Sequence, residues 1–218
     1  EEGSYATSLI HTSGSAVTRS ADAATNAGNS DLFNDSEGVL YAEISSLSLS
    51  GGDGYISITD GTASNRITLR NTSTLNNVVS QCVVGGVNQA SMDFILQDRT
   101  LKNKIAFRYK ANDFSLYVNG QEVLIDTSGT VPSGLKELSF NNGAGVGQWY
   151  GNAKMVAVFK EALTDLELEK LTGYNNHELY MNYYNRLSYL GLVEEYNVES
   201  DINNYILWYQ VYYKYQVL

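Results

Sequence analysis

The segment from Asn141 to Tyr150 places two neighbouring amides, a glycine-rich run and two neighbouring aromatic rings together. The rings of Trp149 and Tyr150 could stack on the C–H face of a pyranose, and the amides of Asn141 and Asn142 could bond its hydroxyls. This pattern predicts a sugar-binding platform. The alternative is that Trp149 packs in the core and the glycines shape a turn, since large aromatic side chains near strands usually serve packing.

The glycines of this segment do not indicate a phosphate-binding loop. A dinucleotide-binding fingerprint needs a third glycine at the sixth place, after a strand and at the start of a helix. Counting from Gly143, Gln148 occupies that place, and a strand pattern follows. We therefore exclude nucleotide binding at this segment.

Oxygen-bearing side chains gather between residues 22 and 35. Asp22, Asp31 and Asp35 supply carboxylates there, with Asn26 and Asn29 among them. Ca²⁺ prefers such ligands, so these three aspartates predict a calcium site. No fixed ligand spacing accompanies them, and a solvated loop built from Asx turns is the alternative.

Residues for catalysis are sparse. The chain has two histidines, His11 and His177, and one cysteine, Cys82. A single cysteine excludes an internal disulfide. Two histidines are too few for a histidine-rich metal centre and argue against a Ser-His-Asp enzyme. Glu43 stands alone on its strand, whereas a retaining glycosidase needs two carboxyl groups about 5–5.5 Å apart. We expect no catalytic residues, and we expect Cys82 to be a small buried hydrophobe.

The overall charge excludes one class of partner. The net charge is −10 and the pI is near 4.6. Nucleic-acid binders need a basic stripe, and the basic residues here are scattered. No run approaches 18 apolar residues, so we expect no membrane span. The chain lacks a leader pattern and an initial Met, so we expect a processed product or a piece of a longer protein.

The sequence up to about residue 160 predicts β-strands, which would position the candidate site residues. Short runs of alternating apolar and polar residues are separated by Gly, Asn, Asp and Ser clusters. Gly85-Gly86 and Asn119-Gly120 predict tight hairpin turns. About ten strands without a long helix predict a two-sheet antiparallel sandwich, with strands at 39–44, 54–59, 65–70, 78–84, 87–95, 104–109, 114–118, 122–125, 135–140 and 154–159.

The pattern changes after residue 160. Thr164 and Glu167 form a capping box, which predicts a short helix over 165–172 with Leu163, Leu166 and Leu171 on its apolar face and Gly173 as its C-cap. Eleven of the 17 tyrosines lie in 174–218. We interpret this extension as helical, although its alternating stretch from Tyr205 onward also fits a strand.

Several motifs resemble one family. The residues KIAFRYK at 104–110, FSLYVNG at 114–120, and the closing YGNAKMVAVF at 150–159 followed by ALTDLEL at 162–168 resemble concanavalin A-like (laminin-G-like) jelly-roll domains. The opening SYATSLI at 4–10 and TSGSAVTR at 12–19 resembles the versions found in bacteriophage tail and surface proteins. The resemblance covers about residues 4–172.

The resemblance implies a domain of two curved sheets, which we place at 1–173. It does not extend to the Tyr-rich segment, which the change in composition sets apart as a C-terminal extension at 174–218. Family members bind sugars, proteins or lipids, often with Ca²⁺ in a rim loop, and others hydrolyse glycans. The hydrolases resembling laminarinases carry E-x-D-x-x-E on one strand, and no strand here has that pattern.

Three hypotheses follow. The first is a non-enzymatic, lectin-like carbohydrate-binding and adhesion domain of a phage tail fibre, virion surface or cell surface, with a surface glycan as its partner. The second is a virion structural protein whose extension at 174–218 mediates homo-oligomerisation or attachment to other virion proteins, because Tyr and Trp favour interfaces. The third, weakest hypothesis is a glycan hydrolase.

Overall fold

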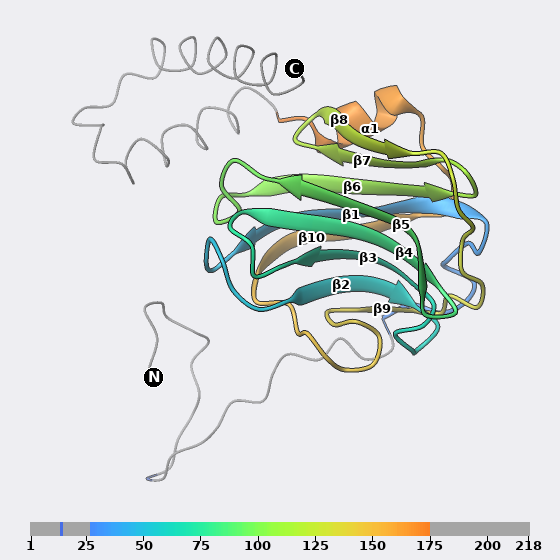
Figure 1. The fold of residues 1–218 in the computed structure, drawn as a ribbon, viewed down its shortest axis with the longest axis horizontal. Helices are drawn as coiled ribbons and strands as arrows, with labels where there is room; N and C mark the ends of the chain where they lie inside the picture. Colours follow the sequence, from blue (N-terminus) through green and yellow to red (C-terminus); the bar gives the residue numbers. More distant parts are fainter. Residues whose placement is uncertain (1–13, 15–26, 175–218) are drawn as a thin grey trace.

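The computed structural model describes residues 27–174 together with Gly14, and these residues form a sandwich of two antiparallel sheets (Figure 1). The first sheet has the order β10-β1-β6-β7-β8, formed by β10 (Gly151–Phe159), β1 (Glu37–Ser46), β6 (Asn103–Lys110), β7 (Phe114–Val118) and β8 (Gln121–Asp126). The second has the order β5-β4-β3-β2-β9, formed by β5 (Val87–Ile95), β4 (Asn77–Val84), β3 (Arg66–Asn71), β2 (Gly54–Thr59) and β9 (Glu137–Ser139). The predicted fold class is confirmed.

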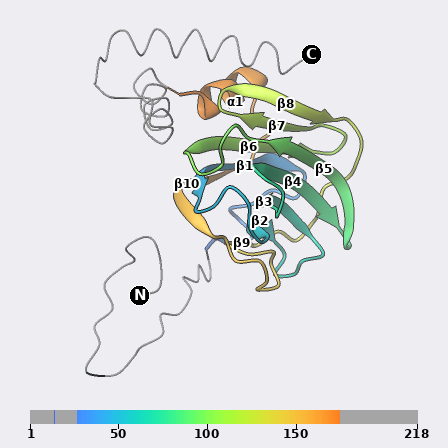
Figure 2. The same ribbon diagram turned by 60° about the vertical axis from the view of Figure 1, so that its left-hand side comes forward.

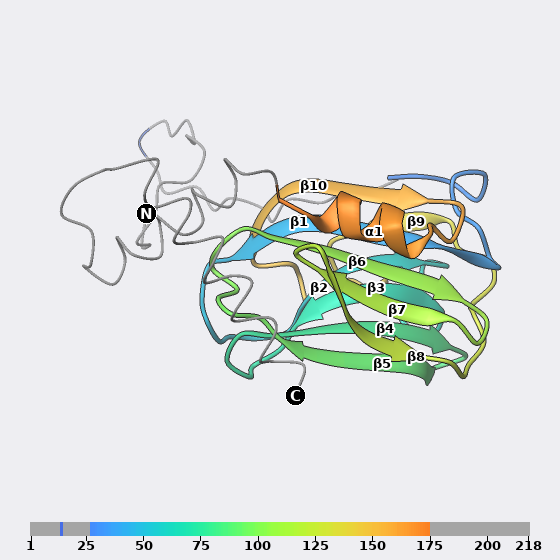
Figure 3. The same ribbon diagram turned by 90° about the horizontal axis from the view of Figure 1, so that it is seen from above.

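The helix α1 (Asp165–Thr172) lies on the outer face of the first sheet (Figures 2 and 3). Residues 1–13, 15–26 and 175–218 lie outside the described residues. The predictions of an extension at 174–218, and of its helical form, therefore stay predictions.

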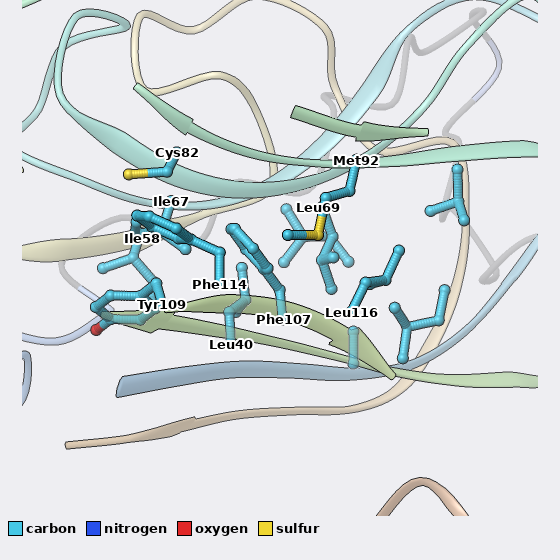
Figure 4. Close-up of a cluster of buried hydrophobic side chains, with 14 of the residues drawn as sticks. Leu40, Ile58, Ile67, Leu69, Cys82, Met92, Phe107, Tyr109, Phe114 and Leu116 are labelled. Atoms are coloured by element: carbon cyan, nitrogen blue, oxygen red, sulfur yellow. The ribbon is translucent and has the colours of Figure 1, made fainter. Parts of the chain in front are cut away.

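Alternation along β1 explains why both of its faces are buried. Leu40, Ala42 and Ile44 face the second sheet and belong to the main core, which Figure 4 shows filling the space between the two sheets. Val39 and Tyr41 point to the opposite face and pack under α1. A strand covered on both sides has no exposed face, because successive side chains point in opposite directions.

Local turn chemistry fixes the hairpins. Asn119 and Gly120 have φ values of 52° and 91°, and Gly85 and Gly86 have φ values of 56° and 82°. Positive φ at both central residues is what a type I′ turn requires, and its twist matches that of the flanking strands. Both predicted tight turns are confirmed. Cys82 is fully buried as predicted, and burial raises the pKa of its thiol to about 12.

The helix begins as the capping box predicts. The Thr164 amide donates to Glu167 Oε2 at 2.8 Å, and the Glu167 amide donates to Thr164 Oγ1 at 3.4 Å. The predicted apolar face is wrong at one position, because Leu166 is 58% exposed while Leu168 is fully buried. Leu168 is the residue that meets the outer face of the sheet, next to Tyr117.

Candidate functional site

Four strand ends meet at one end of the sandwich. There β1 ends at Ser46, β3 ends at Asn71, β2 begins at Gly54 and β10 begins at Gly151. Register explains the meeting, because Ser46 pairs with Gly151 in one sheet and Gly54 pairs with Asn71 in the other. The β1–β2 connection and the segment before β10 therefore lie close together (Figure 1).

A pocket of about 280 Å³ lies among these strand ends. Its wall includes the segment 50–54 and the residues Ser46, Asn71, Arg99, Gln148 and Tyr150. Hydroxyl, amide, guanidinium and aromatic groups thus line one cavity. This volume is at the low end of the roughly 300–1,000 Å³ typical of small-molecule sites.

Arg99 is the cation of this pocket, although only 3% of it is exposed. Its Nε donates to the carbonyl of Ser48 at 2.7 Å, and its Nη1 donates to the carbonyls of Thr72 at 2.7 Å and Thr74 at 3.4 Å. Burial lowers the pKa of the guanidinium, which nevertheless stays charged because the pKa of arginine is far above neutral. Within residues 27–174, Arg99 forms no ion pair with a carboxylate.

Asn76 holds the loops around Arg99 in place. It has a φ of 55°, a left-handed conformation that asparagine tolerates better than most residues. Its amide donates to the carbonyl of Leu49 at 2.8 Å, and its Oδ1 accepts from the Arg99 amide at 3.1 Å. Asn76 and Arg99 together tie the segments at 48–49, 72–76 and 97–99 into one rim.

The opposite wall depends on Gly54. A Cβ at this position would lie 3.2 Å from the Gln148 carbonyl and 3.3 Å from the Tyr150 nitrogen. The missing side chain lets the segment 148–150 pack directly over the start of β2. Tyr150 is 61% exposed there and lines the pocket, as an aromatic platform requires.

The remaining residues of the predicted platform have other positions. Asn141 Oδ1 accepts from the amides of Gly143 and Gly145 at 2.8 and 3.2 Å, and Asn142 Oδ1 accepts from those of Ala144 and Val146 at 3.0 and 3.1 Å. These amide oxygens build the loop and do not line the pocket.

Trp149 is half-buried and packs against the main core. Its indole Nε1 is buried and has no hydrogen-bond partner in the described part of the chain. This placement corresponds to the packing alternative for Trp149. Of the four predicted platform residues, the structure therefore brings Tyr150 to the pocket.

Two of the predicted calcium ligands, Asp31 and Asp35, lie toward the other end of β1. Asp35 accepts from the amides of Gly134 and Leu135 at 2.6 and 3.0 Å, and the Asp31 amide donates to Asn29 Oδ1 at 2.9 Å in an Asx turn. Asp22 is not among the described residues. The residues that are described contain no group of three or more His, Cys, Asp or Glu able to hold a metal ion. The calcium site stays a prediction.

The carboxylates close to the strand ends are paired with cations. Asp53, in the pocket wall, lies 3.2 Å from Arg70 Nη1. Glu43 is buried on the outer face of β1, where its Oε1 lies 3.0 Å from Lys154 Nζ and 3.2 Å from Lys102 Nζ. Burial alone would raise the pKa of Glu43, but the two lysines hold it below its ordinary value.

Sequence reasoning missed Arg99, Ser46 and Asn71. Arg99 is a single basic residue in a turn-rich stretch, and its partners come from segments up to 51 residues away along the chain. No local pattern marks such a residue. Among the described residues, no helix is long and apolar enough to cross a membrane.

Solved structures share this fold at low sequence identity. No family model and no curated protein sequence matches the chain. The CBM40 of the Ruminococcus gnavus IT-sialidase superposes with a TM-score of 0.51 and 16% identity, over 64% of this chain and 84% of that one. The same CBM40 bound to α2,3 sialyllactose also gives a TM-score of 0.51 with 16% identity, over 65% and 84% of the two chains.

A leech intramolecular trans-sialidase, complexed with 2,7-anhydro-Neu5Ac, matches with a TM-score of 0.50 and 18% identity. The match covers 65% of this chain but 24% of the leech protein. These comparisons show that the chain shares the fold of these structures. A shared fold does not by itself assign a ligand.

Proposed function

We propose that this protein is a non-catalytic glycan-binding domain that acts outside the cell, and that the pocket beside Tyr150 takes one sugar residue. The observation that carries the proposal is the combination of an exposed aromatic ring with buried polar side chains in one pocket at the strand ends. An aromatic face packs on the C–H face of a pyranose, and convergent amide and hydroxyl groups orient its hydroxyls.

The structural neighbours support the same function. CBM40 is a carbohydrate-binding module, and it has been solved with α2,3 and α2,6 sialyllactose. It has the same two-sheet architecture as this chain, with a TM-score of 0.51 in each complex. The proposal extends sugar binding to this chain on the strength of its own pocket rather than its sequence identity.

The carboxylates favour binding over hydrolysis. A retaining or inverting glycosidase needs two carboxyl groups that flank the scissile bond. The pocket wall contains one, Asp53, which is paired with Arg70. Glu43 is held ionised by two lysines on the outer face of the sheet, so it is poorly suited to act as a general acid.

A glycan panel tests the proposal with two matched variants of the full chain. Tyr150→Ala removes the proposed platform, whereas Val146→Ala shortens a 64% exposed side chain of the same loop that does not line the pocket. We expect Tyr150→Ala to weaken binding about tenfold through lost apolar contact and stacking. Val146→Ala should bind like the unaltered chain. The absence of binding to every glycan, or equal loss in both variants, would overturn the proposal.

The phage-virion setting and assembly through residues 174–218 stay predictions. Tyr174 is the described start of that segment, and its hydroxyl contacts the Lys102 carbonyl and, at 2.8 Å, Asn119 Oδ1. Tyr174 therefore lies beside the start of β6. Light scattering of the full chain tests assembly, because a monomer at micromolar concentration would contradict it.

A further inference from the structure

One edge of the Arg99 guanidinium faces the pocket without a partner. Its Nε and Nη1 donate hydrogen bonds to three backbone carbonyls, but Nη2 makes no hydrogen bond to any described residue. Nη2 lies next to Gly51, which is part of the pocket wall, because a Cβ added at Gly51 would lie 3.6 Å from Nη2. The N–H groups of Nη2 therefore lie at the pocket wall.

Among the described residues, the charge of Arg99 also has no counter-ion. Backbone carbonyls satisfy donors, but they do not neutralise a full positive charge, and an unpaired buried charge is costly. The other arginine near the pocket, Arg70, is already paired with Asp53. In a chain of net charge −10, the pocket thus carries one local positive charge that a ligand can neutralise.

Ser46 and Asn71 line the same pocket as Arg99 and form a hydrogen-bonded pair. Asn71 Nδ2 donates to Ser46 Oγ at 2.6 Å, and the two residues are 5% and 6% exposed. Because the Ser46 oxygen accepts this bond, its own hydroxyl proton remains to be donated. Ser46 has no acceptor for that proton among the described residues, and both residues line the pocket. A donor beside a guanidinium is an arrangement suited to an oxyanion.

From this geometry we infer that the pocket recognises a saccharide carrying a singly charged anionic group, a carboxylate or a sulfate ester, with Arg99 as its charge partner. This inference rests on the proposed glycan-binding function and names the class of sugar. A single charge fits best, because Arg99 is the one unneutralised cation in the pocket wall and the wall also contains Asp53. A doubly charged phosphate would keep an uncompensated charge close to that aspartate.

Substitution of Gly51 tests the inference without removing Arg99. Gly51→Asp adds a carboxylate beside Nη2, and Gly51→Asn adds a neutral side chain of nearly the same size. Nη2 at 3.6 Å is the only atom that an added Cβ would meet within 4 Å, so both variants should fold. A cooperative thermal unfolding transition in each variant confirms this, with the midpoint of Gly51→Asp equal to or above that of Gly51→Asn because its carboxylate pairs with Arg99.

The probes are matched pairs of saccharides presented to the full chain. Sialyllactose against its neutral methyl ester and a glucuronic-acid-terminated against a glucose-terminated oligosaccharide test a carboxylate. A galactose 6-sulfate-terminated against a galactose-terminated oligosaccharide tests a sulfate ester. We expect the unaltered chain and Gly51→Asn to prefer one charged member of these pairs, and the preferred pair identifies the group. Gly51→Asp should lose about tenfold or more of that affinity, because it supplies an internal anion to Arg99.

The outcomes separate the inference from the proposed function. A loss of affinity for the charged sugar that is about tenfold greater in Gly51→Asp than in Gly51→Asn supports the inference. Equal binding of charged and neutral members, with no difference between the two variants, overturns the inference and leaves glycan binding in place. Failure of every probe and of the wider glycan panel overturns both.

Discussion

Asn71 Nδ2 lies 2.6 Å from Ser46 Oγ, and this hydrogen bond joins the last residue of β3 in one sheet to the last residue of β1 in the other. The bond is buried and lies in the wall of the candidate pocket. The residues that hold the two sheets together at this end of the sandwich are thus among those that would meet a ligand.

Asn71→Ala should destabilise the fold and weaken ligand binding. The variant breaks the bond to Ser46 and leaves a buried hydroxyl without its donor, so we expect the free energy of unfolding to fall by about 1–2 kcal/mol. Asn88→Ala, at an exposed position of β5, is the control and should change it by less than about 0.5 kcal/mol. Urea denaturation measures both. Indistinguishable midpoints would show that the Asn71–Ser46 bond contributes nothing.

Gly54→Ala should disturb the wall that carries Tyr150. The added methyl group would lie 3.2 to 3.3 Å from three backbone atoms of residues 148–150, so the segment must shift by a few tenths of an ångström. We expect about 1–2 kcal/mol of destabilisation and weaker glycan binding. Gly52→Ala is the matched control for stability, since an added Cβ there meets nothing within 4 Å. Equal denaturation midpoints of the two variants would contradict the packing described for Gly54.

Glu43 should make stability depend on acid pH. Lys154 and Lys102 hold its folded pKa below the unfolded value, which for an ordinary glutamate is about 4.3. The folded state then binds fewer protons, so the contribution of Glu43 is complete above the unfolded pKa and is lost as pH falls through the folded pKa. Glu43→Gln should be less stable than the unaltered chain at pH 7.

The stability difference between Glu43→Gln and the unaltered chain should shrink as the pH falls below about 4.3. Thermal unfolding of both proteins at pH 7 and at several acid pH values measures it. A constant difference across that range would mean that the ion pairs with Lys102 and Lys154 do not stabilise the fold.

Arg99→Met should cost more stability than Arg70→Met. Loss of Arg99 removes three hydrogen bonds that its buried guanidinium donates to the carbonyls of Ser48, Thr72 and Thr74, so we expect about 2–3 kcal/mol of destabilisation. Arg70 pairs with Asp53, whose side chain is 48% exposed, and exposed pairs contribute about 1 kcal/mol or less. Denaturant midpoints distinguish the two, and the reverse order would contradict the role given to Arg99.

Local signals predicted most of the fold. The alternating runs gave the ten strands to within a few residues, and Asn119-Gly120 gave a hairpin, because these signals act over a few neighbouring residues. The apolar face of α1 was wrong at Leu166. Its register depends on the outer surface of the sheet, where Leu168 packs, and that surface is assembled from distant strands.

The candidate site was harder to predict for the same reason. Tyr150 was predicted because a neighbouring pair of aromatic residues after a glycine-rich run is visible locally. Arg99, Ser46 and Asn71 come together only when the ends of several strands meet, and nothing near them in the sequence distinguishes them. Asn141 and Asn142 look like ligand-binding amides, yet their oxygens hold the turn that precedes Trp149.

The most direct test of the account is to locate the binding surface by amide chemical shifts of the full chain, during titration with the glycan that binds best in the panel. We expect chemical-shift perturbations only at one end of the sandwich, in Ser46, the segment 50–54, Arg99 and residues 148–150. Perturbations centred on Asp31 and Asp35 toward the other end of β1, with the pocket unchanged, would contradict it.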